Sequence, residues 1–288
     1  MRITQISKYR EEILLLLPPA LLLTVFVVVP ILAVFGISFT EWPIIGVPKF
    51  LGVQNYSHLL QDNIFRISMR NTLYYTIILV PSITLLSLGL ASMLNAAFPG
   101  SNIFKTIYVI PIVAGIVVTS NIWKGLLTTF GPVNQLLTGI GLSPVNFFSP
   151  TLAIWSVSLS LLWRNIGYYT IFFLAGMKSI PAEVYDAAAI DGSTGLHTFL
   201  KITLPLLKPI TLLVVILNTI GSFQIFTVVY IMTGGGPANA TISLLNYIYD
   251  TGWKFFRMGY ASSQAVIFFG VLLLLSIIQK RYIGGETS

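Results

Sequence analysis

The chain has 288 residues, of which 55% are hydrophobic and only 9% are charged, and its mean hydropathy is +0.86. Soluble domains carry about 25% charged residues, so this composition excludes a soluble globular protein, and the high apolar content excludes a disordered chain. The chain has no cysteine, which excludes disulfides, thiolate zinc sites and thiol nucleophiles, and its two histidines, His58 and His197, suit no multi-histidine metal site. We therefore expect an integral membrane protein without a metal site.

Long segments without charged residues predict the helices that cross the membrane. A helix needs about 20 apolar residues to cross a hydrocarbon core about 30 Å thick, and uncharged segments of about that length recur along the chain. Dividing the longest segments at clusters of Gly, Pro and Asn gives six helices, near residues 13–38, 71–95, 105–128, 151–176, 210–232 and 260–279. The predicted fold class is an all-α integral membrane protein with six transmembrane helices.

The distribution of basic residues predicts the orientation of these helices. With the N-terminus inside, nine Lys and Arg residues lie in cytoplasmic segments and six in external ones, the direction that the positive-inside rule favours. We expect both termini in the cytoplasm. The net charge of +7 then reflects topology and contact with anionic lipids, because nothing in the sequence resembles a nucleic-acid-binding element.

The predicted cytoplasmic loop from 178 to 209 concentrates charge, since it holds three of the nine acidic residues. Pro181 suits the first turn of a helix whose positive dipole end favours nearby acids, and Gly192 can end that helix in a left-handed cap. A second short helix is expected from Ser193 or Thr194, ended by Pro205 and Pro209. The pattern leaves two interpretations open: a helix–turn–helix that presents Ala and Asp to a partner, or an amphipathic connector packed on its own bundle.

Residues 185–192 have the sequence Tyr-Asp-Ala-Ala-Ala-Ile-Asp-Gly, and residues 201–207 follow as Lys-Ile-Thr-Leu-Pro-Leu-Leu. With the preceding segment 176–181, they closely resemble the EAA loop of permease subunits of bacterial binding-protein-dependent ABC importers. Within that family, residues 50–56 and 233–237 are similar to carbohydrate permeases of the maltose and glycerol-3-phosphate type. Asp186 stands where the family usually has Glu, and the negative charge is retained.

The resemblance covers nearly the whole chain and implies a type I ABC importer permease fold, with residues 1–288 as one transmembrane permease domain. It implies that residues 178–209 form a coupling loop that sits in a cleft of a separate ATPase subunit. The residues implied in coupling are Glu183, Asp186, Ala187, Ala188, Asp191 and Gly192. The chain has no G-x-x-x-x-G-K-[ST] phosphate loop, so we expect no cofactor in this chain and no enzymatic activity, with ATP and Mg²⁺ bound by the partner ATPase.

Polar residues in the fourth and fifth predicted spans mark the expected substrate pathway. Arg164 lies near the middle of a span, where a charge is costly and tends to face a cavity or a partner. Amides that pair with hydroxyls, together with an aromatic face, suit a sugar. The pathway residues predicted are Arg164, Asn165, Tyr168, Asn218, Gly221, Ser222 and Ile225, with Gln224 projecting elsewhere. Two alternatives stay open: the small polar residues join helices, and Arg164 anchors the structure instead of contacting substrate.

Two external loops are predicted to dock an extracytoplasmic solute-binding protein, one through Asn55 and the other through Gly234, Gly235, Gly236 and Pro237. The other partners implied are a second homologous permease subunit, two ATPase subunits and membrane lipid, in a bacterial plasma (inner) membrane. A secondary transporter or channel for a small polar solute is the alternative. It would need acids at membrane depth, and the predicted spans contain none. The sequence therefore predicts the permease subunit of an ATP-driven sugar importer, without identifying the sugar.

Overall fold

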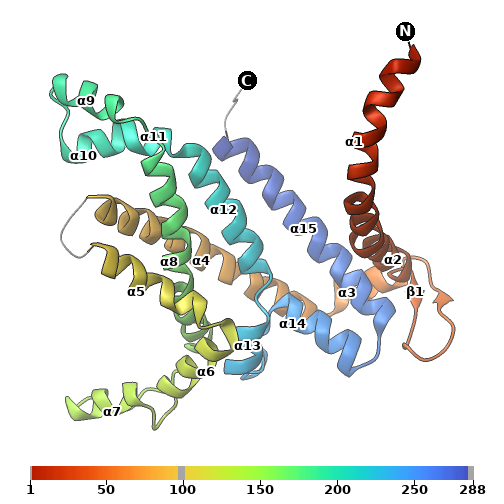
Figure 1. Ribbon diagram of the computed structural model, residues 1–288. Coiled ribbons are helices and arrows are strands. Elements are labelled where there is room, and N and C mark those ends of the chain that lie inside the picture. Colours follow the sequence, from red (N-terminus) through yellow and green to blue (C-terminus); the bar gives the residue numbers. More distant parts are fainter. Residues whose placement is uncertain (1, 97–100, 285–288) are drawn as a thin grey trace. The chain divides into compact units, whose positions relative to one another are not determined.

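The computed structural model describes residues 2–96 and 101–284, and the chain forms two compact units (Figure 1). One unit comprises residues 1–62 and 248–269, and the other comprises residues 63–247 and 270–288. Helices make up most of both units, which confirms the predicted all-α class. The prediction that residues 1–288 form one domain stays a prediction.

The first unit begins with a long apolar helix. α1 (Arg2–Leu23), the π-helical turn η1 (Thr24–Val28) and α2 (Val29–Ile37) follow one another without a break. A short hairpin comes next, in which β1 (Thr40–Glu41) pairs antiparallel with β2 (Lys49–Phe50), and α3 (Gln54–Gln61) follows it. The unit also contains η3 (Asp250–Lys254) and the first half of α15 (Met258–Gly284). The Tyr260 hydroxyl donates a 2.7 Å hydrogen bond to Asp62, which joins α15 to the residue after α3.

The second unit holds the helices that carry the predicted pathway and coupling residues. Its elements are α4 (Asn63–Asn95), α5 (Ser101–Val113), α6 (Ile116–Leu126), α7 (Pro132–Gly139), α8 (Ala153–Lys178), α9 (Ala182–Ile190), α10 (Gly195–Thr198), η2 (Phe199–Thr203), α11 (Leu204–Leu206), α12 (Lys208–Phe223) and α13 (Thr227–Met232). α14 (Leu244–Tyr249) begins in this unit. The core lies where α4 packs against α8 and α12, and its fully buried side chains include Tyr75, Phe173 and Val214.

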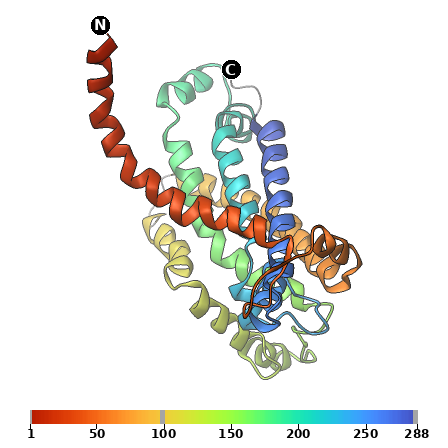
Figure 2. The same ribbon diagram turned by 90° about the vertical axis from the view of Figure 1, so that its right-hand side faces the viewer.

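The ends of this unit differ in character. In both ribbon views the green-to-teal segment α9–α11 lies at one end of α8 and α12 (Figures 1 and 2). α13 follows α12 at the opposite end (Figure 1). The predicted coupling loop and the predicted glycine-rich docking loop are therefore separated by the length of the helices.

Four helical segments within the described chain are long and apolar enough to cross a membrane: Leu14–Ile37, Asn63–Asn95, Lys208–Met232 and Met258–Tyr282. The third of them comprises α12 and α13. The second begins eight residues before the predicted residue 71. The third predicted span, 105–128, is two helices bent by 95°, because Gly115 adopts a φ of +76° between α5 and α6. If α5 and α6 together count as one bent span, the described chain has up to five candidate spans.

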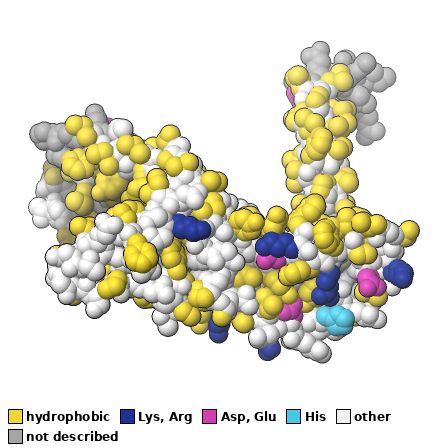
Figure 3. All heavy atoms as spheres, turned by 90° about the horizontal axis from the view of Figure 1, so that it is seen from below, with side chains coloured by type: hydrophobic (Ala, Val, Ile, Leu, Met, Phe, Trp, Pro, Cys, Tyr) yellow, Lys and Arg dark blue, Asp and Glu magenta, His cyan; other side chains and the backbone are white. Residues whose placement is uncertain are grey.

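The fourth predicted span coincides with α8, whose 26 residues rise about 39 Å and exceed the hydrocarbon thickness. Its serines, together with Arg164 and Asn165, lower its hydropathy, and it is not among the four apolar helices. The count of six spans and the orientation with both termini inside therefore stay predictions. Figure 3 shows one face of the molecule, on which hydrophobic and uncharged groups predominate and charged side chains are few.

Candidate transport and coupling sites

The predicted coupling loop forms a helix, a left-handed turn and a second helical segment. α9 follows Pro181 and ends at Ile190, Asp191 is its C-cap residue, and Gly192 then adopts a φ of +77°. The amide of Ser193 donates to the carbonyl of Ala188 at 2.9 Å and closes the turn. A Cβ at Gly192 would meet no atom within 4 Å, so the constraint on this residue is its backbone conformation and not the space around it. The predicted left-handed cap is confirmed.

The second helical segment ends between Pro205 and Pro209, the two prolines predicted to end it. α10, η2 and α11 succeed one another, and Pro205 lies within α11 instead of ending the helix. Proline cannot donate the helical backbone hydrogen bond, and its ring crowds the preceding turn. The wider π-helical turn of η2, which directly precedes α11, leaves room for it. α11 ends before the buried Leu207, after which α12 begins with Pro209 in its first turn.

The predicted coupling residues of α9 do not all lie on one exposed face of the helix. Glu183, Asp186, Ala187 and Asp191 are exposed, whereas Ala188 is only 6% exposed and contributes to the core of its own unit. The prediction that Ala188 faces outward is wrong, because Ala188 lies on the side of α9 that faces the second arm of the same segment, near His197 and Ile202. The hydroxyls of Ser193 and Thr198 are 2.8 Å apart and join the two arms of the segment across the turn.

A cavity of about 230 Å³ lies among α4, α6, α8, α12 and the segment 224–228. It brings together six of the seven predicted pathway residues: Arg164, Asn165, Asn218, Gly221, Ser222 and Ile225. The face of α8 that lines it passes through Leu161, Asn165 and Tyr169, which are spaced by four residues each. None of the residues that line the cavity is acidic.

The cavity corrects two predictions. Tyr168 does not line it, because its ring lies off the Asn165–Tyr169 face and packs on Phe172, with ring centroids 5.2 Å apart. The neighbouring Tyr169 takes its place. Gln224 also lines the cavity, since α12 ends at Phe223 and the helical spacing that would turn Gln224 away no longer applies.

Hydrogen bonds show how the polar groups of the cavity are held. Arg164 Nη1 donates to Asn165 Oδ1 at 3.3 Å, and Asn165 Nδ2 donates to the carbonyl of Leu161 at 2.9 Å. Arg164 Nε is buried without a hydrogen-bond partner. Asn218 Nδ2 donates two long bonds, of 3.3 and 3.4 Å, to carbonyls of α4. Asn218 thus joins α12 to α4 while it lines the cavity.

The glycine-rich loop after α13 is fixed by residues that the sequence interpretation missed. Asn71 Nδ2 donates to the carbonyls of Asn239 and Ile242, at 2.9 and 3.1 Å, and the Tyr75 hydroxyl donates to the carbonyl of Thr241 at 3.0 Å. Asn71 and Tyr75 are one helical turn apart on α4 and are almost completely buried. Two polar side chains spaced four residues apart in an otherwise apolar helix were the sequence signal that could have identified these residues.

Two of the predicted docking residues are buried. Gly235, with a φ of +88°, lies against Ile242, whereas Gly234 and Pro237 are exposed. Asn55 is 4% exposed, and its amide donates to the carbonyls of Ser38 and Thr40, both at 2.9 Å. Asn55 therefore holds the start of α3 to the end of α2 and to β1 within the first unit.

Comparison with known proteins decides the family. The model of a family described as the inner membrane component of binding-protein-dependent transport systems matches residues 71–284. The chain belongs to this family. It is therefore a multi-pass protein of the plasma membrane and a translocation subunit of an importer, which confirms the predicted family and localisation.

Several characterised relatives are similar over nearly their whole length. A sulfoquinovosyl glycerol transport permease of Agrobacterium fabrum is 33% identical over 94% of this chain and 89% of its own. A trehalose/maltose transport permease of Thermococcus litoralis is 32% identical, covering 97% and 96%. A lactose transport permease of Rhizobium radiobacter is 33% identical, covering 91% and 90%.

Solved structures share the fold. A bacterial ABC transporter involved in the import of the acidic polysaccharide alginate aligns with a TM-score of 0.81 and 22% identity over 100% of both chains. The alginate transporter in complex with an alginate pentasaccharide-bound periplasmic protein gives 0.84 and 22% over 97% of both chains. The predicted ABC importer permease fold is confirmed.

Proposed function

We propose that this permease forms half of the pathway of an ATP-driven sugar importer. The other half is a second homologous permease subunit, and two ATPase subunits and an extracytoplasmic solute-binding protein complete the assembly. The names of the relatives support a sugar as substrate, since three of them transport sugars or sugar derivatives. The observation that carries the proposal is the coupling segment, in which exposed acids precede a left-handed turn at Gly192.

The coupling segment suits a partner that changes conformation. Glu183, Asp186 and Asp191 are exposed on a short helix, and basic or polar groups of an ATPase can pair with them. The 2.8 Å contact between Ser193 and Thr198 and the 3.3 Å contact between the hydroxyls of Tyr185 and Thr203 join the two arms of the segment. Because the segment is continuous in sequence with α8 at one end and α12 at the other, force applied to α9 reaches both helices. ATP and Mg²⁺ bind to the ATPase, because this chain has no phosphate loop, and the chain itself is not catalytic.

The cavity is the proposed substrate pathway within this subunit. Asn165, Ser222 and Tyr169 offer groups that exchange hydrogen bonds with sugar hydroxyls, and Tyr169 adds an aromatic surface. Arg164 supplies the positive charge of the lining. Exposed Gly234 and Pro237 form a proposed docking surface for the binding protein. The segment that Asn55 organises in the first unit is a separate proposed contact.

Uptake by the purified assembly in liposomes tests the proposal. Radiolabelled maltose, lactose and an acidic sugar are offered in turn with the binding protein outside and ATP inside. We expect uptake of at least one sugar that stops when either ATP or the binding protein is withheld. Uptake that continues without both would identify a secondary transporter or channel and would contradict the proposal.

A further inference from the structure

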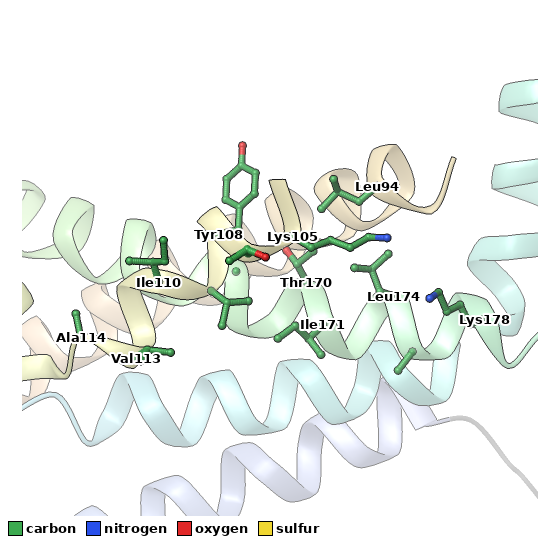
Figure 4. A pocket seen from close by; sticks show the side chains of 14 residues that line it. Leu94, Lys105, Tyr108, Ile110, Val113, Ala114, Thr170, Ile171, Leu174 and Lys178 are labelled. Carbon is green, nitrogen blue, oxygen red and sulfur yellow. The ribbon is translucent and has the colours of Figure 1, made fainter. Parts of the chain in front are cut away.

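A groove of about 840 Å³ runs along α5 and α8 (Figure 4). It is distinct from the cavity described above, because the two share no lining residue. Its walls are mainly aliphatic, and no acidic residue is among them. Val113 is 78% exposed and Ile171 is 46% exposed, so the groove is open along its length. An apolar groove of this size on a membrane protein requires an apolar occupant.

The two walls meet at a glycine. A Cβ at Gly167 on α8 would lie 1.7 Å from the carbonyl oxygen of Tyr108 on α5, so the helix backbones are in direct contact there. From Gly167 to Lys178, eleven residues of α8 rise about 16 Å. The hydrocarbon core of a bilayer is about 30 Å thick. The groove between this contact and the end of α8 therefore matches the depth of one leaflet.

Positive charge lies at the far end of the groove. Lys105 projects from α5 and Lys178 is the last residue of α8, and their amino groups converge at the same end of the groove (Figure 4). Lysine stems lie along apolar surface while their ammonium groups reach the polar boundary. Two lysines at that boundary attract the phosphate of an anionic lipid.

We propose that this groove binds one anionic phospholipid, with an acyl chain along Ile171 and Leu174 and its phosphate between Lys105 and Lys178. The length of the groove matches one leaflet, its aliphatic walls match an acyl chain, and its two lysines match an anionic headgroup. A helix of a partner subunit is about 10 Å wide and cannot lie between α5 and α8, whose backbones touch at Gly167, whereas a thinner acyl chain can lie along the groove beside that contact. Because α9 begins four residues after Lys178, the lipid headgroup lies beside the start of the coupling segment.

Fluorescence quenching tests the proposal, and the absence of native cysteines allows one labelled position at a time. A bimane is attached at Ile171→Cys in the full-length chain, assembled with cysteine-free partner subunits in nanodiscs. The matched control is Leu273→Cys on α15, because Leu273 is 48% exposed and lies outside the groove. The probes are phosphatidylglycerol and phosphatidylcholine with a nitroxide on the acyl chain.

We expect phosphatidylglycerol to quench the label at 171 at a mole fraction at least fivefold lower than phosphatidylcholine, with no difference between the two lipids at 273. Fivefold is roughly the effect of one basic residue near an anionic surface. Lys105→Gln with Lys178→Gln should remove the preference, whereas Lys280→Gln, outside the groove, should leave it. Equal quenching by both lipids at 171 would show bulk lipid only. No quenching at 171 would show that a partner subunit fills the groove. Either result would overturn the proposal.

Discussion

A single backbone conformation, that of Gly192, holds the coupling segment in shape. Replacement with valine introduces a β-branched side chain at a φ of +77°, which costs about 1–3 kcal/mol, although the new Cβ would meet no atom. We expect Gly192→Val to remove sugar-stimulated ATP hydrolysis while membrane insertion remains. Gly192→Asn is the matched control, since asparagine tolerates the left-handed region, and it should retain most of the activity. Normal coupling in the valine variant would refute the role of the turn.

Two adjacent tyrosines provide the sharpest test of the cavity. Tyr169 lines it and Tyr168 does not. If the Tyr169 hydroxyl pairs with a sugar hydroxyl, Tyr169→Phe leaves a buried group unpaired, which costs on the order of 1–3 kcal/mol, or about 5- to 150-fold in affinity. We expect the apparent KM for uptake to rise by that factor in Tyr169→Phe and to change less than about twofold in Tyr168→Phe. Equal behaviour of the two variants, per assembled complex, would contradict the assignment.

At the scale of elements, the packing of α5 on α8 depends on Gly167. An alanine there would place its Cβ 1.7 Å from a carbonyl oxygen of the facing backbone, so α5 must move. Overpacking of this kind costs typically 1–3 kcal/mol. Gly167→Ala should therefore lower the melting temperature of the purified assembly by several degrees. Gly89→Ala on α4, with open space around it, is the control and should be neutral or stabilising. An unchanged melting temperature in Gly167→Ala would show that the helices are not in close contact.

At the scale of the whole molecule, predictions that follow from composition and backbone chemistry agree with the structure. Uncharged apolar segments predicted the long helices, and the positive φ of Gly192 follows from its place after a short helix. Predictions that need the direction of a side chain were less accurate. Ala188 faces the second arm of its own segment and Tyr168 lies off the cavity, because helical spacing defines a face without identifying what packs on it.

Long-range contacts could not be predicted from the sequence either, because a local pattern does not identify the distant residues that pack on it. Asn71 holds the loop after α13 across 168 residues of chain, and no local pattern links the two. Gln224 lines the cavity only because α12 ends one residue earlier. The places where helices end, bend or touch therefore determine the site, and they depend on tertiary packing.

Crosslinking of α9 tests the central claim, that this segment docks on an ATPase, most directly. Ala187 is exposed and its neighbour Ala188 is 6% exposed, and the chain contains no cysteine that would interfere. A short cysteine-to-lysine crosslinker is applied to the assembled transporter carrying Ala187→Cys or Ala188→Cys. We predict that position 187 crosslinks to the ATPase subunit and position 188 does not. A transporter that is active in uptake but yields no crosslink from position 187 in any nucleotide state would contradict the account.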